Sequence, residues 1–378
     1  MAQSLADALA EINDPETIEQ LLSGIDESDN TQSSSPSSAS NQSTLSKLYE
    51  RFLRRRQNRS PATISNYKRT LPGFVQFAAS RHALYPGEIT TELVDAYVDS
   101  LLQEYDSDAT ILLHTSNVRP WLKWLNKREL CREAVYHILD KDELGLSPNA
   151  REEALPEKEA TAILEALREQ QYGSNLHALL ELLWNTGIRI GEIRALDLRD
   201  VNQADNDLAV RHRPDEGTRI KNGRAGDATN GDGERDLNLH SRVVDALSAY
   251  ISLNRPETTD GFGRDPLFTT AHGRPARSTL RRWVYEATSC RWVDPELTER
   301  SCDGSCDPDS NVCAHSYYPH AVRRGAIVTH LSNDLRPDKA AERFDVSTDV
   351  IRKHYDPRSK ARRKNDRADA VKDAWSDL

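Results

Sequence analysis

The sequence predicts a mainly α-helical protein with a small β-hairpin or sheet. Apolar residues recur at helical spacing through residues 44–140 and again towards the C-terminal end. Only two short stretches, 208–213 and 235–239, have the composition of strands, and a Gly- and Asp-rich turn lies between them. Long helical segments with one isolated hairpin indicate a helical bundle followed by a mixed α+β domain.

Composition divides the chain into segments. Its 378 residues suffice for two or three domains, because a domain commonly holds about 100–200 residues. The stretch 23–43 is rich in Ser, Asn, Gln and Asp and has few side chains to bury, which is typical of disorder. The predicted organisation is an acidic, Ser-rich disordered tail (1–43), a helical domain (44–140), a second domain (150–365) with a Cys-rich insertion (290–315), and a C-terminal tail (366–378).

The predicted elements follow from local signals. In the first domain, four helical patterns indicate a bundle, and the second of these helices begins at Ser60-Pro61, with Ser as the N-cap and Pro in the first turn. In the second domain, two helices precede the hairpin and several follow it. Their expected ranges are 160–168, 176–184, 241–253, 278–287, 320–333, 338–344 and a Ser347-capped helix over 347–355.

The formal net charge of −10 argues at first against a polyanionic partner such as DNA. However, residues 1–46 hold 8 acidic residues and no Lys or Arg, so the rest of the chain, with 50 basic and 52 acidic residues, is nearly neutral. Two basic clusters lie in that remainder, and a local basic surface is what nucleic-acid binding requires. They are Arg51, Arg54, Arg55, Arg56, Arg59, Lys68 and Arg69, and then Arg352, Lys353, Arg358, Lys360, Arg362, Arg363 and Lys364.

Two further expectations concern the protein's environment. No apolar run approaches the roughly 18–20 residues of a membrane span, and the N-terminus has neither a basic nor an apolar signal region, so a cytoplasmic location is expected. The chain has 12 Lys against 38 Arg and an acidic balance. That composition indicates a halophilic host, because a saline cytoplasm screens an acidic surface.

Residues with chemical potential occur in an informative order. The chain has no Walker loop, no GxGxxG after a strand, no GxSxG and no HExxH. It has instead four separate signals. They are Thr186-Gly187-Ile188-Arg189-Ile190-Gly191-Glu192, Lys221 beside the hairpin, His320-Ala321-Val322-Arg323, and Tyr355.

This series resembles the tyrosine recombinases, the phage-integrase family of site-specific DNA recombinases. The resemblance implies a core-binding domain over 44–140, a tyrosine-recombinase catalytic domain over 150–365, and cleavage of double-stranded DNA through a 3′-phosphotyrosyl intermediate. It also implies a homotetramer on paired sites and no cofactor for catalysis. The residues implied in catalysis are Arg189, Lys221, His320, Arg323 and Tyr355. Those expected to bind DNA are Arg54, Arg55, Arg56, Arg59, Lys68 and Arg324.

The residue types suit that chemistry. Metal-free cleavage of a phosphodiester needs a nucleophile, cations for the added negative charge and a proton donor for the leaving oxygen. Arg189 and Arg323 offer forks that match phosphate oxygens, and His320 exchanges protons near neutral pH. Lys221 is the only lysine between Lys158 and Lys339, in a stretch that otherwise uses Arg. A lysine ammonium can protonate a leaving oxygen, whereas Arg stays charged.

Each assignment has an alternative. Arg189 could cap a helix or pair with Glu192, Lys221 could be a chance survivor, and Tyr355 could be a packing residue. Tyr317 and Tyr318 are rival nucleophiles, but they precede the HxxR motif. The sequence also departs from the family, because Val346, with Asp345 beside it, stands where many members have a second His or a Trp. His354, adjacent to Tyr355, is a candidate to substitute for that residue in part.

Four cysteines cluster just before the HxxR motif, at Cys290, Cys302, Cys306 and Cys313. Clustered thiols in a cytoplasmic protein indicate structural Zn²⁺ more than disulfides, and His315 could replace one ligand. The alternative is an irregular acidic insertion whose thiols bind no metal.

Two other functions remain open at this level. A catalytically inactive recombinase-fold DNA-binding regulator would keep the same pattern of elements. A tyrosine-dependent DNA-relaxing topoisomerase would use the same nucleophile. The complete set of five implied catalytic residues argues against the first, and the helical module ahead of the catalytic domain argues against the second.

Overall fold

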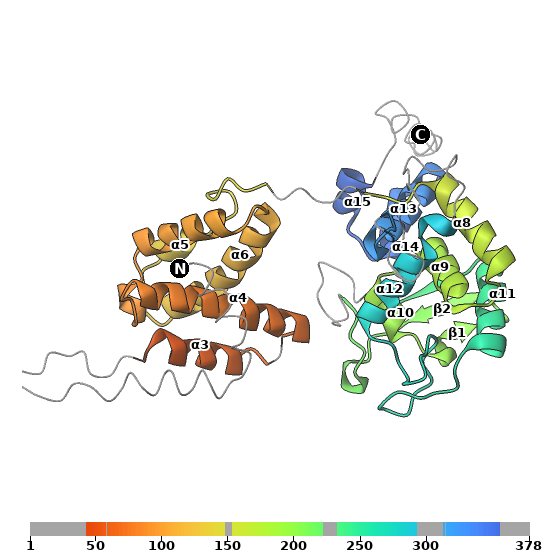
Figure 1. Ribbon diagram of the computed structural model, residues 1–378, viewed down its shortest axis with the longest axis horizontal. Helices are drawn as coiled ribbons and strands as arrows, with labels where there is room; N and C mark the ends of the chain where they lie inside the picture. Colours follow the sequence, from red (N-terminus) through yellow and green to blue (C-terminus); the bar gives the residue numbers. More distant parts are fainter. Residues whose placement is uncertain are drawn as a thin grey trace, which may run out of the picture. The chain divides into compact units, whose positions relative to one another are not determined.

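The computed structural model describes residues 43–57, 59–147, 153–221, 233–292, 313 and 315–355. The chain divides into two compact units, Met1–Ala150 and Arg151–Leu378 (Figure 1). The predicted tail over 1–43 lies outside the described residues except for its last position. The predicted C-terminal tail and most of the Cys-rich insertion also lie outside them.

The first unit is helical, as predicted. Its elements are α3 (Leu45–Arg54), α4 (Pro61–Ser80), η1 (Pro86–Glu88), α5 (Thr91–Glu104), α6 (Asp108–Asn126) and the short α7 (Ala134–His137). Three of these helices begin where a side-chain oxygen accepts a backbone N–H group. Thr44 caps α3, Ser60 caps α4 ahead of Pro61, and Thr90 caps α5.

The core of the first unit is built on aromatic side chains. Phe74, on α4, packs edge-on against Tyr97 of α5, with ring centroids 5.0 Å apart, and against Trp121 of α6 at 5.9 Å. Phe74 and Trp121 are completely buried. Edge-to-face pairs of this kind add about 0.5–1.5 kcal/mol beyond the area they bury. Three helices are thereby fixed around one contact.

The second unit contains more helices and one small sheet. Its helices are α8 (Glu157–Gln170), α9 (Asn175–Thr186), α10 (Ile190–Ala195), α11 (Ser241–Ala249), α12 (Arg277–Ala287), α13 (Pro319–Ser332), α14 (Pro337–Phe344) and α15 (Thr348–His354). Its 3₁₀ turns are η2 (Leu198–Asp200), η3 (Pro214–Glu216) and η5 (Cys290–Trp292), and η4 (Tyr250–Asn254) is a π turn. Its strands are β1 (Val201–Asn202), β2 (Asp207–Val210) and β3 (Arg235–Asn238).

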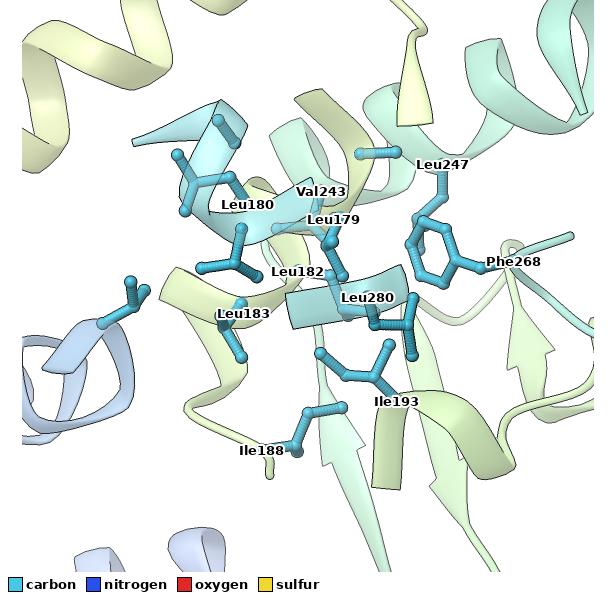
Figure 2. Packing of buried hydrophobic residues seen from close by; sticks show 14 of the residues in the cluster. Leu179, Leu180, Leu182, Leu183, Ile188, Ile193, Val243, Leu247, Phe268 and Leu280 are labelled. Carbon is cyan, nitrogen blue, oxygen red and sulfur yellow. The ribbon is translucent and has the colours of Figure 1, made fainter. Parts of the chain in front are cut away.

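Helix α9 is the centre of this unit. It contacts α8, α11, α12 and α13, and it is buried on nearly every side. Figure 2 shows Leu179, Leu180, Leu182 and Leu183 of this helix packed among residues of the surrounding elements. A helix that is apolar all round belongs in a core. Truncation of one of these leucines to Ala is expected to cost about 2–5 kcal/mol.

The sheet is antiparallel, with strand order β1-β2-β3. Leu208 of β2 pairs with Leu237 of β3, and Val210 pairs with Arg235, so the predicted hairpin is present. Strand β2 ends at Val210, three residues before the predicted end. The two-residue strand β1 was not predicted, because two residues carry no readable alternation. The described residues therefore confirm the predicted fold class of helices with a small sheet.

The predicted helix over 241–253 changes its hydrogen bonding near its end. It is α-helical to Ala249 and continues as a π turn.

In the part of the chain that the structure describes, no helix is long and apolar enough to cross a bilayer.

Candidate active site

A tight turn after α9 positions the first predicted catalytic residue. Thr186 donates its hydroxyl to the carbonyl oxygen of Leu182 at 2.6 Å, and Gly187 ends the helix with φ +56°. A Cβ at Gly187 would also lie 2.8 Å from the ring of Phe344. Only glycine satisfies both the left-handed backbone and this close approach. The turn sets Arg189 as the N-cap residue of α10.

Arg189 is held by two carboxylates. Its backbone N–H donates to Glu192 Oε2 at 2.8 Å, and its Nη1 donates to Glu192 Oε1 at 2.9 Å. Nη1 also donates to the carboxylate of Asp345 at 2.5 Å, and Nη2 donates to the Asp345 carbonyl oxygen at 2.5 Å. The side chain is still 21% exposed. Pairing with Glu192, the alternative role considered for Arg189, thus occurs and fixes the guanidinium at an accessible position.

Glu192 joins α10 to the sheet. Its side chain is completely buried, and Arg235 of β3 donates to its Oε2 at 3.0 Å. Burial opposes ionisation of Glu192, but the charges of Arg235, Arg189 and Arg323 outweigh burial and lower the pKa of its carboxyl. Arg235 also donates to the carbonyl oxygen of Arg343 at 2.8 Å. The sequence did not indicate Arg235, because its partners lie far from it along the chain.

Helix α13 contributes the HxxR residues. Pro319 starts the helix, and Arg323 lies one turn later with 3% of its surface exposed. Arg323 donates to the carbonyl oxygens of Gly187 and Phe344, both at 2.5 Å. Burial and then the charge of Arg189 lower the pKa of Arg323 to about 10, so the guanidinium stays protonated at neutral pH.

His320 lies among positive charges. Its ring is accessible to solvent but partly covered by its neighbours, and this desolvation is the largest cause that lowers the pKa of His320. Four cations lower it further, namely Arg323, Arg324, Arg189 and Lys221. The imidazole is therefore mainly neutral at pH 7 and is able to accept a proton.

Tyr355 follows α15 and is 7% exposed. It packs with a small apolar cluster that includes Ile327, Leu331, Phe344 and Ile351. The guanidinium carbon of Arg324 lies 5.5 Å from the centre of its ring. Tyr355 also acts electrostatically on Arg323. The tyrosine thus has a packing role, and it also lies beside two arginines of α13.

Lys221 is exposed, at the last described position before the gap at 222–232. Its charge contributes to the lowered pKa of His320, which places the ammonium within electrostatic range of the imidazole. The five residues predicted for catalysis therefore come together from α10, the hairpin, α13 and the end of α15.

The rival tyrosines occupy other positions. Tyr317 is 2% exposed, and its hydroxyl donates to Glu159 Oε2 at 2.7 Å. Tyr318 is the N-cap residue of α13 and packs partly against the core of the second unit. Tyr317 is therefore a core residue, and its hydroxyl faces a carboxylate rather than the cluster of cations.

Two family models match this sequence. Residues 25–129 match the N-terminal SAM-like domain of phage integrases, and residues 153–289 match the phage integrase family. Together these ranges cover more than half of the chain. The chain is a tyrosine recombinase of the phage integrase family. The second match ends before α13, so the placement of His320, Arg323 and Tyr355 rests on the geometry above.

Curated relatives of this recombinase include tyrosine recombinases from bacteria. Tyrosine recombinase XerD of Staphylococcus aureus is 24% identical over 314 residues, which cover 82% of this chain and 94% of the relative. Tyrosine recombinase XerC of Pelotomaculum thermopropionicum is 25% identical over 327 residues, which cover 80% and 94%. These relatives make the protein a site-specific recombinase, a DNA strand transferase, and disfavour both alternative functions.

Solved structures show the same fold. The Tn1549 transposon integrase in complex with a circular intermediate DNA has a TM-score of 0.64 at 13% identity, with 86% of this chain and 99% of that chain covered. A lambda integrase dimer bound to a COC′ core site has a TM-score of 0.57 at 14% identity, with 84% and 97% covered.

The departure of the recombinase from its family is now located. Val346 is partly buried against the apolar cluster around Tyr355. Its neighbour Asp345 has φ +49°, ends α14, and holds Arg189. His354 is exposed on α15. The position that carries a His or a Trp in many members is thus apolar here, and the neighbouring carboxylate reaches Arg189.

Arg324 lies beside Tyr355, although the sequence grouped it with residues that bind DNA. Its Nε is buried and has no hydrogen-bond partner among the described residues. A buried donor without an acceptor is costly. An oxygen of a bound phosphate would satisfy it.

The predicted basic surface of the first unit is present in the recombinase. Arg54, Arg55, Arg59 and Lys68 are exposed, and Arg56 stacks on the ring of Phe52 at 4.7 Å. Arg128, which the sequence analysis missed, belongs to the same surface. Desolvation, followed by the charges of Arg55, Arg51 and Arg56, lowers the pKa of Arg128. Arg128 also lies over the ring of Trp124 at 3.9 Å.

Of the four clustered cysteines, the structure describes two. Cys290 begins η5, and Cys313 is 6% exposed. Cys302 and Cys306 lie outside the described residues.

Proposed function

We propose that the recombinase binds double-stranded DNA and cleaves it with Tyr355 as the nucleophile. The observation that carries this proposal is the group of four cations around His320, whose pKa is lowered by burial and by these charges, together with the Arg324 guanidinium 5.5 Å from the centre of the Tyr355 ring. The set has a phenol to attack phosphorus, a base to take its proton, and guanidinium groups to hold the negative charge of the phosphorane.

The proposed step balances without a metal. The Tyr355 oxygen attacks phosphorus while its proton passes to neutral His320. Arg189, Arg323 and Arg324 hold the non-bridging oxygens. The bond from phosphorus to the 5′ oxygen breaks, and Lys221 gives that oxygen a proton. A 3′-phosphotyrosyl bond remains, and attack on it by the 5′ hydroxyl of another strand reverses every transfer and rejoins the DNA.

The DNA partner is supported by the basic surface of the first unit and by the relatives. Several of the solved relatives are complexes with DNA, among them the Tn1549 and lambda integrases. In this chain Arg54, Arg55 and Arg59 are exposed in one short stretch, and such cations bind phosphates regardless of sequence. The proposed active assembly is a homotetramer on two paired sites, because exchange of two duplexes requires four strand cleavages.

The deciding experiment captures DNA attached covalently to the full chain without an added crosslinker. The wild type is expected to yield adducts that map to one short sequence, and Tyr355→Phe is expected to yield none. Tyr172→Phe is the matched control, because Tyr172 is 52% exposed and packs beside His177 away from the cation cluster. Adducts that persist in Tyr355→Phe would overturn the assignment of the nucleophile.

A separate measurement tests the proposed homotetramer. Light scattering of the Tyr355→Phe protein on a duplex that carries two copies of the captured sequence is expected to give four chains per pair of duplexes. A particle that never exceeds two chains would refute the tetramer and leave the assignment of the nucleophile intact.

A further inference from the structure

Two cysteines meet at the base of the stretch that precedes α13. Cys290 lies just after α12, and Cys313 is 23 positions further along the chain. Their sulfur atoms lie 3.5 Å apart. His315 is adjacent, with its Nδ1 3.9 Å from the Cys313 sulfur, and its backbone N–H donates to that sulfur at 3.3 Å.

These distances match metal ligation better than a disulfide. A disulfide has an S–S length of about 2.05 Å. Two thiolates on one tetrahedral zinc, each with a bond of about 2.3 Å, lie about 3.8 Å apart. A thiolate and an imidazole nitrogen on the same ion lie about 3.6 Å apart by the same geometry. The observed S–S and N–S separations are within about 0.3 Å of these values.

We propose that Cys290 and Cys313 are ligands of a structural Zn²⁺, with the Nδ1 atom of His315 as a third donor. Thiolates with imidazole form a ligand set that selects zinc over hard cations such as Mg²⁺ or Ca²⁺. Among the described residues, no group of three or more His, Cys, Asp or Glu side chains is arranged so that it could hold a metal ion. Binding of the ion would therefore require the two sulfur atoms to move apart by about 0.3 Å, and the Cys313 sulfur and the His315 Nδ1 atom to approach by about 0.3 Å.

The site lies just before α13, the helix that carries His320 and Arg323. Ser316 donates to the carbonyl oxygen of Tyr285 at 2.7 Å, and the Tyr317 N–H donates to Thr288 Oγ1 at 3.0 Å. These bonds already join the end of α12 to the residues before α13. A zinc ion bound to both Cys290 and Cys313 would link the same two segments through its coordination bonds. Its role is structural, and the proposal is independent of the proposed function.

The test measures metal in the full chain, purified without chelator from cells supplied with zinc. About one zinc ion per chain is expected in the wild type, and less than about a fifth of that in Cys290→Ser and Cys313→Ser. Cys131→Ser is the matched control, because Cys131 is a half-buried thiol of the other unit. Wild-type protein without zinc, or a Cys290–Cys313 disulfide found by non-reducing peptide mapping, would overturn the proposal.

A second readout avoids variants that fail to fold. Exchange of zinc for Co²⁺ in the wild-type chain is expected to produce a sulfur-to-cobalt charge-transfer band and the visible bands of tetrahedral cobalt. Octahedral cobalt without a charge-transfer band would refute thiolate ligation.

Discussion

Asp345 holds Arg189 through both its side chain and its backbone. The carboxylate accepts from Nη1 and the carbonyl oxygen accepts from Nη2, each at 2.5 Å. Asp345 is able to make both contacts because its left-handed backbone turns the chain at the end of α14. An arginine that is proposed to hold a phosphate therefore already has an anionic partner. The scissile phosphate has to compete with Asp345 for this guanidinium or share it.

This competition predicts the effect of Asp345→Asn. Asparagine keeps an oxygen that can accept a hydrogen bond and leaves the carbonyl contact in place, but it removes the negative charge. We expect DNA affinity, measured in a Tyr355→Phe background, to rise by roughly threefold to tenfold, because about 1.4 kcal/mol corresponds to a factor of ten. Asp349→Asn is the control, since it removes an exposed carboxylate from the neighbouring helix α15. Weaker binding by Asp345→Asn would show that the carboxylate mainly positions Arg189.

The lowered pKa of His320 predicts how cleavage depends on pH. The neutral ring is the form that accepts the tyrosine proton, and desolvation together with four cations favours that form. The kcat/KM for cleavage is therefore expected to stay level as pH falls to about 6.5, the ordinary pKa of His, and to decline only below it. This decline at low pH, the acid limb of the profile, reports a pKa of the free enzyme, because kcat/KM depends on the ionisation of the free enzyme.

The matched variant is His320→Asn, which should cleave more slowly, by about 10²-fold or more, and lose the acid limb. His354→Asn, at an exposed position next to the nucleophile, should keep the limb. A limb that survives in His320→Asn, or one with a midpoint above 6.5 in the wild type, would contradict His320 as the base.

Much of the local structure could be predicted because its signals are local. The cap at Ser60, for example, accepts from the N–H of Thr63, three residues away. The N-cap role of Ser347 was also predicted correctly from sequence. The order of the motifs indicated the family before any geometry was known. Such features depend on residues that are close to one another in the sequence.

The rest of the site depends on contacts between distant segments. Arg235 reaches Glu192 across 43 positions, and Asp345 reaches Arg189 across 156. Neither residue stands out in a chain with so many charged side chains. Asp345 was noted only as the neighbour of Val346, and its contact with Arg189 arises from how α14 ends.

A substitution of Lys221 tests whether this residue acts as a proton donor or only as a positive charge. Lys221→Arg keeps the positive charge near His320 but cannot release a proton at neutral pH. Cleavage of ordinary DNA is expected to slow by about 10²-fold or more, the usual contribution of a general acid. A substrate with sulfur in place of the leaving 5′ oxygen needs no proton at that atom, so its cleavage should slow by less than about threefold.

The control for this comparison is Lys339→Arg, which changes an exposed lysine paired with Glu342 at 3.1 Å. It should leave both substrates unaffected. Equal slowing of the oxygen and sulfur substrates by Lys221→Arg would show that Lys221 acts through position or charge and not as the acid.

A buried ion-pair network predicts how the stability of the second unit depends on pH. The Asp260 side chain is 6% exposed and pairs with Arg264 at 3.0 Å and Arg274 at 2.8 Å. Burial alone would raise its pKa, but the backbone N–H groups of Arg264 and Phe262 and the charge of Arg274 outweigh burial and lower the pKa of Asp260 to about 2. The ordinary value of the group is 3.8. Ionised Asp260 therefore contributes about 2 kcal/mol at neutral pH.

That contribution is fully present above about pH 4 and is lost as the pH falls towards 2, because the folded state then binds the proton less readily than the unfolded state. Asp260→Asn should lower the free energy of unfolding at pH 7 by at least about 2 kcal/mol, since it also removes one of the carboxylates that pair with the buried guanidinium groups of Arg264 and Arg274. Its difference from the wild type should shrink as the pH is lowered from 4 to 2. Denaturant titration across that range measures the loss at pH 7 and its dependence on pH.

The control is Asp236→Asn, which breaks an exposed pair with Arg211 at 2.6 Å and should lower the free energy of unfolding by less than about 1 kcal/mol. If Asp260→Asn lowers the free energy of unfolding no more than Asp236→Asn does, or by an amount that does not depend on pH, the Asp260 carboxylate does not stabilise the unit in this way.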